Sequence, residues 1–279
     1  MTLPPGSSAA VAVGGGNINA GYRVLLADGA QAFVKTRADV HAGEYEAEAA
    51  GLDWLREPGA LRTPRVLDRG EGYLALEWIE QGHLSAQGAE ELGRGLALTH
   101  AAGAPGFGAA PGSRAGAARL GSVSLPNEPC ASWPQFYAQR RLLPLARMAA
   151  ARGALSARGE RAVARTCERL GELAGPAERP ARLHGDLWWG NVLAGADGRA
   201  WLIDPWAYGG HREVDLAMLT LFAGAPARVL DAYREQSPLA PGWQDRVGLY
   251  QLMPLLLHAA LFAGSYGASA ERIALRYGG

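Results

Sequence analysis

Two apolar runs around an Asp-Gly turn, inside an otherwise helical half of the chain, constrain the fold most. Within residues 183–206, Asn191 begins one run, Asp204 ends the next, and Asp197-Gly198 separates them. An Asp-Gly pair between two β-prone segments predicts a hairpin. Because the two strands of a hairpin lie side by side, we expect Asn191 and Asp204 to meet beside the loop that carries Asp186.

This order of carboxylate, amide and carboxylate is the one that phosphoryl-transfer sites require. Asp186 is predicted to accept the proton of the attacking hydroxyl. Asn191 and Asp204 are predicted to bind Mg²⁺, which prefers hard oxygen ligands. His184 is assigned a structural role, with its ring bonded to the backbone of the loop. The alternative, that the two aspartates only cap turns, requires all four residues to fall in this order by coincidence.

The first half of the chain offers a matching cation. Lys35 is the sole lysine among 27 basic residues, and it lies near the end of the apolar strand 31–36. A compact ammonium differs from a guanidinium in reach and shape, so we expect Lys35 to contact the phosphates of ATP; the alternative is a surface lysine kept by chance. On the helical segment 41–56, Glu48 falls on the apolar stripe with Leu52. An acid there is costly unless it is paired, which makes Glu48 the predicted partner of Lys35.

A glycine-rich loop and a short link complete the predicted nucleotide site. The loop departs from the G-x-G-x-x-G pattern because Asn19 stands where the third glycine belongs. A hairpin follows it rather than a βαβ unit, which excludes a dinucleotide-binding fold. The carbonyl of Glu77 and the amide of Ile79 are expected to face the adenine edge. The residues predicted to contact ATP from these two segments are Gly15, Gly16, Asn17, Glu77, Trp78 and Ile79.

Hydrophobic periodicity divides the chain near residue 80. Residues 1–80 are predicted to form a nucleotide-binding lobe, with a hinge near 77–80, from one helix at 41–56 and a five-stranded, mostly antiparallel sheet. The predicted strands are Ala9–Val13, Tyr22–Ala27, Gln31–Thr36, Arg65–Asp68 and Tyr73–Trp78.

Residues 81–279 are predicted to form a larger, mainly helical catalytic and substrate lobe. Its predicted helices are Ala89–Ala102, Trp133–Arg152, Ala157–Ala174, Glu213–Ala223, Ala227–Glu235 and Gly242–Ala263. The segment 103–129, rich in Gly, Pro and Ser, is predicted to be a long surface loop. The fold class is therefore α+β with two lobes.

The composition of the chain limits which binding partners and which cellular location we expect. The 27 basic and 27 acidic residues balance, which excludes a strongly basic nucleic-acid binder and a long acidic tail. The most apolar stretch, 249–263, is shorter than the roughly 20 residues of a membrane span, and the N-terminus lacks a basic segment typical of a secretory signal. Cys130 and Cys167 are too few for a disulfide framework. We expect a cytoplasmic protein that binds neither nucleic acid nor membrane.

Several motifs together resemble one family of kinases. The run His184–Asn191 and the segment Asp204–Met218 are similar to those of the fructosamine/ketosamine kinase family, within the wider aminoglycoside-phosphotransferase-like kinases. Segments 14–19, 33–35 and 133–142 are similar as well, so the resemblance covers most of the chain. It implies a protein-kinase-like fold and the Mg²⁺-dependent transfer of phosphate from ATP to the sugar 3-hydroxyl of a ketoamine, which is a glycation adduct on an amine or a protein lysine. Because such 3-phosphates decompose and release the amine, it also implies a role in deglycation.

The resemblance carries the roles given above to Asp186, Asn191, Asp204, Lys35 and Glu48, and it adds one for Asp215. Asp215 is implied to hold the catalytic loop from the helix that follows. The alternative is that Asp215 is an ordinary acidic residue in the first turn of a helix, where such residues are common.

Two residues are predicted to contact the acceptor. An aromatic ring can stack on the apolar face of a sugar, so Trp188 is predicted to contact the acceptor. His211 is a second substrate contact or else fixes its loop. The preferred ketoamine and the oligomeric state stay open.

Two other functions compete with the ketosamine kinase. The first is a phosphotransferase for an aminoglycoside or another amino alcohol. The second is a kinase-like module that binds without catalysis, which the joint presence of Lys35, Asp186, Asn191 and Asp204 argues against.

Overall fold

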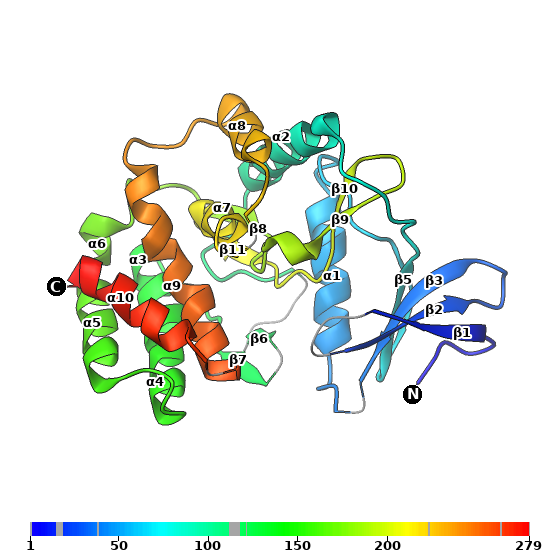
Figure 1. Cartoon of the computed structure of the whole chain (residues 1–279), viewed down its shortest axis with the longest axis horizontal. Coiled ribbons are helices and arrows are strands. Elements are labelled where there is room, and N and C mark those ends of the chain that lie inside the picture. The colour runs from blue at the N-terminus through cyan, green and yellow to red at the C-terminus, as the bar shows by residue number, and fades with distance from the viewer. Residues whose placement is uncertain are drawn as a thin grey trace.

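Five antiparallel strands and one helix form the smaller lobe of the computed structural model (Figure 1). The strands lie in the order β1-β2-β3-β5-β4. Their bounds are β1 Ser8–Val13, β2 Ala20–Leu25, β3 Gln31–Thr36, β4 Val66–Gly70 and β5 Tyr73–Glu77, and the helix is α1 Glu44–Arg56. All five predicted strands are present. The structure describes residues 2–14, 19–37, 39–111, 118–120, 122–222, 224–262 and 264–278.

Helix α1 stands between the sheet and the larger lobe (Figure 1). Its buried side chains Tyr45, Ala49 and Leu52 pack against Leu74 and Leu76 of β5. One face of the helix thus holds the sheet, and the helix also borders the segment that follows β10. This placement is what allows a side chain of α1 to meet residues of both lobes.

The larger lobe is mainly helical, with short strand pairs inserted. Its helices are α2 Ala86–Ala102, α3 Trp133–Phe136, a π-helical turn Tyr137–Leu142, α4 Leu143–Ala151, α5 Ala157–Glu168, α6 Leu170–Leu173, α7 Glu213–Leu219, α8 Ala227–Gln236, α9 Trp243–Phe262 and α10 Tyr266–Gly278. Its strands are β6 Ala118–Leu120, β7 Val123–Leu125, β8 Ala181–Leu183, β9 Val192–Ala194, β10 Ala200–Leu202 and β11 Tyr208–Gly210. The serines that precede α2, α3 and α5 each accept a hydrogen bond from a backbone amide of the first turn, which fixes where these helices begin.

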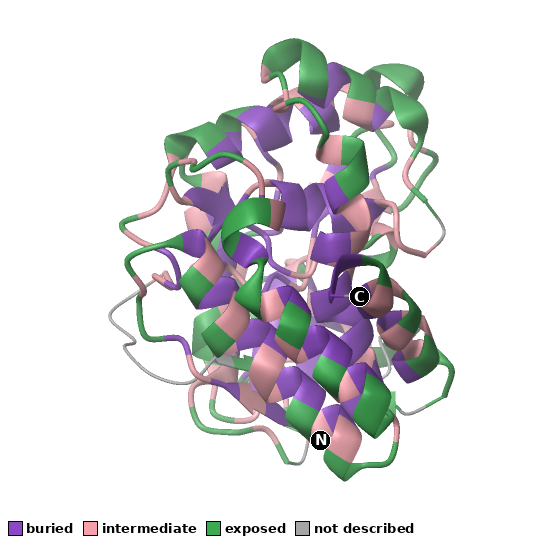
Figure 2. Ribbon diagram, turned by 90° about the vertical axis from the view of Figure 1, so that its left-hand side faces the viewer, coloured by how far each residue is buried: buried purple, intermediate pink, exposed green. Residues whose placement is uncertain are grey.

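Two hydrophobic cores hold this lobe together. Helices α2, α7 and α8 pack around Leu96, Leu216 and Val229, together with Leu187 and Leu202 from the segment around the hairpin β9–β10. The helices α4, α5, α9 and α10 pack around a second core. In Figure 2 the buried sides of the helices face inward and the exposed sides face solvent. The first core lies directly under the predicted catalytic loop.

Three features differ from the sequence prediction. The segment 103–129 is not a simple loop, because β6 and β7 pair within it and Val123 and Leu125 are buried. Helix α10 was not predicted; the side chains that it buries are mostly small, such as Ala270 and Ala274, together with Tyr277. The strands β8 and β11 pair with each other, and strands of three residues are too short for an alternating pattern to reveal them.

The π-helical turn carries one buried cation. Arg141 is fully buried, and its guanidinium carbon lies 4.5 Å from the ring centroid of Phe136, 4.8 Å from that of Trp206 and 4.6 Å from that of Tyr208. Among the described residues it has no carboxylate partner, and the rings supply much of its stabilisation. Trp206 follows Asp204 by two residues, so this cluster supports the predicted site from behind.

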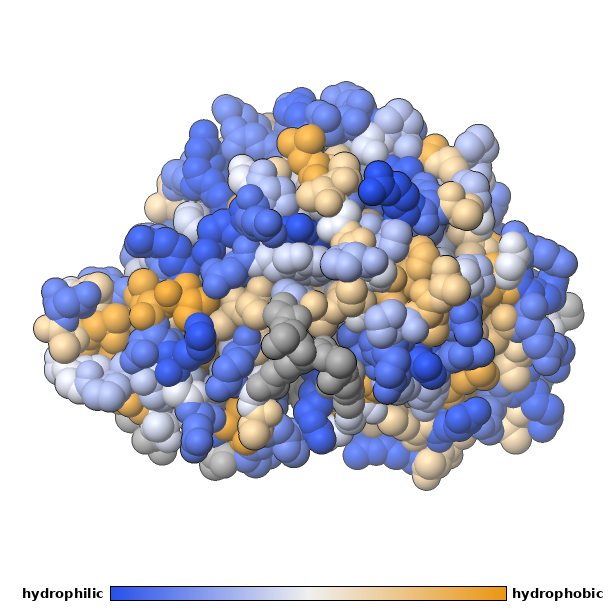
Figure 3. Space-filling view, turned by 180° about the vertical axis from the view of Figure 1, so that it is seen from behind, coloured by the Kyte–Doolittle hydropathy of each residue, from blue (hydrophilic) through white to orange (hydrophobic). Residues whose placement is uncertain are grey.

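Three further findings concern membrane spans, the surface and the cysteines. No helix within the described ranges is long and apolar enough to cross a membrane. Figure 3 shows one face of the molecule, where hydrophilic residues predominate and hydrophobic residues form small separate patches. Cys130 and Cys167 are free thiols.

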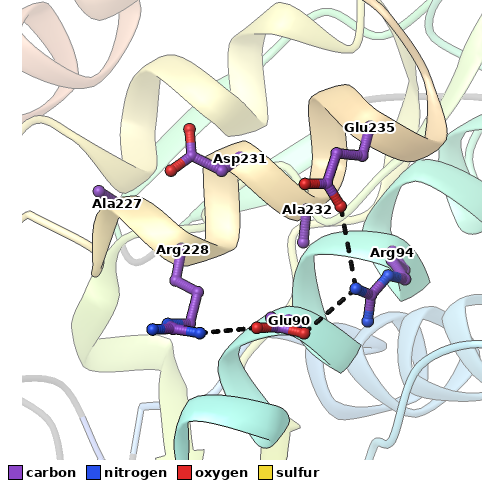
Figure 4. Close-up of a pocket in the computed structure, with 7 residues that line it drawn as sticks. All are labelled: Glu90, Arg94, Ala227, Arg228, Asp231, Ala232 and Glu235. Atoms are coloured by element: carbon purple, nitrogen blue, oxygen red, sulfur yellow. Dashed lines mark hydrogen bonds and ion pairs between the residues drawn. The ribbon is translucent and has the colours of Figure 1, made fainter.

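A hollow between α2 and α8 contains none of the residues predicted to act in catalysis (Figure 4). Glu90 of α2 lies at its centre and accepts hydrogen bonds from Arg228 of α8 at 2.8 Å and from Arg94 at 3.1 Å. Glu90, Arg94, Arg228 and Glu235 are therefore paired within the hollow, and these pairs link the two helices.

Because α2 packs closely on α8, we expect the stability of the protein to fall when a side chain is enlarged at their interface. A Cβ added at Gly93 would lie 2.2 Å from the carbonyl oxygen of Val229, so Gly93→Ala should lower the free energy of unfolding by about 2–3 kcal/mol. At Gly171, which has open space around it, the same change should alter stability by less than about 1 kcal/mol. Urea denaturation measures both variants, and equal stability of the two would contradict the packing described.

Candidate active site

The ammonium of Lys35 joins the two lobes. Lys35 Nζ, on β3, donates to Glu48 Oε1 of α1 at 2.7 Å and to Asp204 Oδ1 at 2.6 Å. Lys35 and Glu48 therefore lie together as predicted, and the additional bond to Asp204 reaches the larger lobe. Burial by itself would lower the pKa of Lys35, but the nearby charges of Asp204 and Glu48 raise it above its ordinary value. The group is a buried cation held by two carboxylates.

The hairpin β9–β10 brings the predicted catalytic residues together. Leu202 pairs with Val192, and the amide of Ile203 donates to the carbonyl of Asn191 at 3.1 Å. The side-chain amide of Asn191 donates to the backbone carbonyl of Asp186 at 2.8 Å and to its Oδ2 at 3.2 Å. Asp186, Asn191 and the segment leading to Asp204 thus meet on one side of the hairpin, opposite Lys35.

Asp204 has a strained backbone. Its φ is 55°, and Asp204 is one of two residues other than glycine with positive φ among the described residues. A non-glycine residue in this left-handed region costs about 1–2 kcal/mol. The strain is compensated by the interactions on either side, including the bond from the Trp206 amide to the carbonyl of His184 at 2.9 Å. Strain of this kind concentrates where a side chain must point in one direction.

Negative charge accumulates at the site. Burial and the charge of Asp204 raise the pKa of Asp186 to about 7, although the hydrogen bond from Asn191 by itself lowers this pKa. Burial also raises the pKa of Glu48 to about 7, although Lys35 opposes this. Three carboxylates thus lie close enough to influence one another with a single ammonium among them, an arrangement that a bound divalent cation would stabilise.

Asp215 and His184 hold the loop through its backbone. Asp215 Oδ2 accepts from the His184 amide at 2.7 Å, and Oδ1 accepts from the Gly185 amide at 2.9 Å. The His184 ring donates from Nε2 to the Ile203 carbonyl at 2.9 Å and accepts at Nδ1 from the Asp186 amide at 3.3 Å. Burial lowers the pKa of His184, which suits the neutral tautomer that these bonds require. Both residues make the contacts expected of loop supports.

Sequence reasoning missed His100, which extends this network. Its Nε2 lies 3.3 Å from Asp215 Oδ2, and its Nδ1 lies 2.9 Å from the hydroxyl of Tyr233. Since all three side chains are buried, they join α2, α7 and α8 behind the catalytic loop. No signal in the sequence could have paired them, because the partners are more than 100 positions from His100.

Arg182 was also missed. Its Nη1 donates to Glu57 Oε2 and to the carbonyl of Trp54, both at 2.6 Å, and its guanidinium carbon lies 4.7 Å from the ring centroid of Trp54. Arg182 belongs to β8 and its partners lie at the C-terminal end of α1, so it forms a second connection between the lobes.

The predicted link between the lobes engages the hairpin. Glu77 is the last residue of β5, its amide donates to the Arg65 carbonyl at 2.8 Å, and Trp78 lies 4.6 Å from the guanidinium carbon of Arg23. The Ala196 amide donates to the Glu80 carbonyl at 2.8 Å, which attaches the link to the β9–β10 turn. Ile79 lies between these contacts in the link. Of the predicted ATP contacts, Gly15, Gly16 and Asn17 lie outside the described residues.

The two predicted substrate contacts differ in exposure. Trp188 is 39% exposed, and its ring covers Gly190 so closely that a Cβ there would lie 2.1 Å from a ring carbon. His211 is only 2% exposed, and its ring stacks on Tyr250 with centroids 5.2 Å apart. Burial lowers the pKa of His211 to about 4. Of the two roles predicted for His211, fixing its loop fits this burial and contact with substrate does not.

Comparison with known proteins identifies the family. The sequence model of the fructosamine kinase family matches residues 5–277. The chain belongs to the fructosamine kinase family. The predicted resemblance is therefore confirmed, and the enzyme is a phosphotransferase with a hydroxyl acceptor, as predicted.

Individual relatives agree with this assignment. A protein of Synechocystis sp. named "probable ketoamine kinase" is 36% identical over 270 residues, which cover 94% of this chain and 87% of that protein. A crystal structure from Thermobifida fusca, described as that of a fructosamine-3-kinase, is 45% identical with a TM-score of 0.87 and covers 97% of this chain and 94% of that one. A choline kinase from Streptococcus pneumoniae is 16% identical with a TM-score of 0.61, covers 98% of this chain and 93% of its own, and shares the fold alone. The kinase-like α+β fold with two lobes is thus confirmed.

The raised pKa of Asp186 predicts how the stability of this kinase depends on pH. Between its ordinary value of 3.8 and about 7, the folded protein keeps a proton that the unfolded chain has released, so stability falls as pH rises through this range. Asp186→Asn removes this penalty. In EDTA, the gain in unfolding free energy from Asp186→Asn should be larger at pH 8 than at pH 5 by about 2 kcal/mol.

The control is the turn residue Asp197, whose pKa is lowered by the backbone bond from Arg199 and by the charge of Arg62. Its carboxylate is already ionised at pH 5, so the effect of Asp197→Asn should be the same at both pH values. Denaturant titrations measure the difference, and an Asp186→Asn effect that does not change with pH would contradict the assigned electrostatics.

Proposed function

We propose that this kinase transfers the γ-phosphoryl group of ATP to the 3-hydroxyl of the sugar in ketosamines, the adducts of a sugar with an amine. The observation that carries the proposal is the convergence of Asp186, Asn191 and Asp204 opposite Lys35. These side chains come from both lobes, and together they offer a base, oxygen ligands and a phosphate-binding cation.

The names of similar proteins support the acceptor class. The relatives described above are named for ketoamines and for fructosamine, and the pneumococcal choline kinase has also been crystallised with AMP. Kinase-like structures that act on aminoglycosides share 13–18% identity with this chain, which extends to the fold alone. Among the described residues, no contact favours the alternative acceptor, an aminoglycoside or another amino alcohol.

The donor atoms fit Mg²⁺. Within the described part of the chain, Asn191 Oδ1 and Asp204 Oδ2 have no hydrogen-bond partner, and both are oxygens of the kind that Mg²⁺ prefers. No group of three or more His, Cys, Asp and Glu side chains in these ranges could hold a metal ion by itself. The site therefore suits a cation that takes its other ligands from water and from phosphate, and bound Mg²⁺ would neutralise charge on the transferring phosphoryl group.

Under this proposal, each residue of the site has a separate role in the transfer of the phosphoryl group. The acceptor hydroxyl attacks the γ-phosphorus, the bond from that phosphorus to the β,γ-bridging oxygen breaks, and Asp186 accepts the hydroxyl proton. The raised pKa of Asp186 suits a base that works near neutral pH. Lys35 would hold the α- and β-phosphates while Glu48 keeps its ammonium oriented. Asp204 would hold the cation, and its hydrogen bond to Lys35 would weaken.

Three further proposals follow from the same site. Residues 1–80 bind the nucleotide with a hinge at 77–80, and residues 81–279 bind the acceptor. Glu77, Trp78 and Ile79 approach the adenine through the backbone, with Gly15, Gly16 and Asn17 at the phosphates. Since a ketoamine 3-phosphate breaks down to release its amine, the product of this kinase would lead to deglycation.

Removal of the proposed base tests the function. Asp186→Asn should lower kcat for a ribulosamine or fructosamine by about 10²–10⁴-fold, because general-base catalysis contributes on that scale, while Mg·ATP still binds. ADP release measures turnover, and calorimetry measures nucleotide binding. The variant Asp197→Asn, in the turn of the same hairpin, should keep wild-type turnover.

A panel of acceptors separates the candidates. Wild-type protein should release ADP with ketoamines and not with kanamycin. Full turnover of Asp186→Asn would remove the proposed base, and phosphorylation of kanamycin without any ketoamine would overturn the acceptor class.

A further inference from the structure

A continuous set of aromatic rings begins at the catalytic loop. The ring centroid of Trp188 lies 6.1 Å from that of Phe222, which follows α7. Phe222 lies 5.2 Å from His258 of α9 and 6.4 Å from Tyr266 of α10, and His258 lies 5.6 Å from Phe262. We call these five side chains, Trp188, Phe222, His258, Phe262 and Tyr266, the aromatic surface.

The aromatic surface is open to solvent at both ends. Six large hydrophobic side chains are exposed among the described residues, and the two aromatic ones are Trp188 at 39% and Phe262 at 49%. The other four are aliphatic and belong to other elements. Phe222, His258 and Tyr266, which connect the two ends, are partly exposed. Of the described Phe, Tyr and Trp rings, the two most exposed therefore lie at the two ends of the aromatic surface, and one of them, Trp188, is two residues from the proposed base.

One end ring and one connecting ring of this series are held in place by the fold. Trp188 lies flat against Gly190, where any side chain would displace it. His258 Nδ1 lies 2.7 Å from the carbonyl of Pro254, one turn earlier in α9, which assigns the donor to Nδ1. Burial lowers the pKa of His258, so the ring is neutral at pH 7. Its Nε2 has no partner among the described residues and can accept a hydrogen bond.

The position of the aromatic surface suggests what it binds. A sugar whose 3-hydroxyl reaches Asp186 lies next to Trp188, two residues further along the loop. Three centroid steps of 6.1, 5.2 and 5.6 Å connect Trp188 to Phe262, and together they are longer than one sugar ring. What lies over the outer rings is therefore the rest of the acceptor molecule, which in a ketosamine is the amine-bearing part.

We propose that the aromatic surface binds the amine-bearing part of the ketosamine and selects acceptors whose amine carries an aromatic or apolar group. This proposal rests on the proposed function and adds the substrate class to it. None of the five rings is charged at neutral pH, and burial of apolar area against them favours apolar partners over polar ones. The free Nε2 of His258 can accept a hydrogen bond from a donor group of the acceptor.

The test compares two acceptors that share one sugar. For fructosyl-phenylalanine and fructosyl-glycine, the wild-type ratio of kcat/KM should be about tenfold or more, mainly through KM, since one buried aromatic side chain contributes on that scale. Phe262→Ser and Phe222→Leu should bring the ratio close to one. The control Leu98→Ser alters an equally exposed side chain on α2 and should leave the ratio at its wild-type value. Thermal melts verify that each variant is folded.

The outcomes separate the two proposals. Equal kcat/KM for both acceptors in an active enzyme, or a ratio that Phe262→Ser and Phe222→Leu leave unchanged, would overturn the aromatic surface and leave the kinase assignment standing. Failure to phosphorylate either ketosamine would overturn the proposed function and this inference with it. Sedimentation of the wild type as a dimer that Phe262→Ser dissociates would show that a second copy covers these rings, and would also overturn the inference.

Discussion

The ammonium of Lys35 lies between two carboxylates from different lobes, and the geometry of the site depends on it. Glu48 and Asp204 each accept a bond of 2.6–2.7 Å from Nζ. A compact ammonium can satisfy two acceptors at this distance from a single atom, whereas a planar guanidinium spreads its donors over a fork. This difference accounts for a lysine at the one position in a chain that otherwise uses arginine. Lys35 and Glu48 are largely buried, whereas the side chain of Asp204 is 41% exposed. Loss of Lys35 or Glu48 therefore leaves a buried charge without this partner.

The larger lobe supplies a rigid loop against which this cation is held. Asp215 bonds two consecutive backbone amides of the loop, and His100 contacts Asp215 from behind. The left-handed backbone of Asp204 is tolerated because its neighbours are fixed in this way. Under the proposed function, rigid support on one side and an ion pair on the other would let Asp186 and Asn191 keep one arrangement as a nucleotide binds, which is the preorganisation that phosphoryl transfer requires.

The local sequence pattern predicted those features of the fold and the site that depend on residues close together in the chain. The hairpin around Asp197-Gly198 and the stripe that carries Glu48 follow from turn chemistry and helical periodicity, and both place their side chains where the site needs them. Contacts over long sequence separations could not be predicted: nothing local indicates that His100 meets Asp215 or that His211 is buried against Tyr250. The short strands β6–β8 and β11 were missed because three residues are too few to show an alternating pattern, and helix α10, which buries mostly small side chains, was missed as well.

The single lysine allows the central interaction to be measured directly. In protein labelled with ¹⁵N at lysine Nζ, one side-chain resonance should appear, with slow hydrogen exchange at neutral pH because the ammonium is buried and doubly bonded. It should shift in Glu48→Gln, in Asp204→Asn and on addition of Mg·ATP to the wild type. A resonance that exchanges rapidly, as an exposed lysine does, and that none of these changes moves would contradict the account.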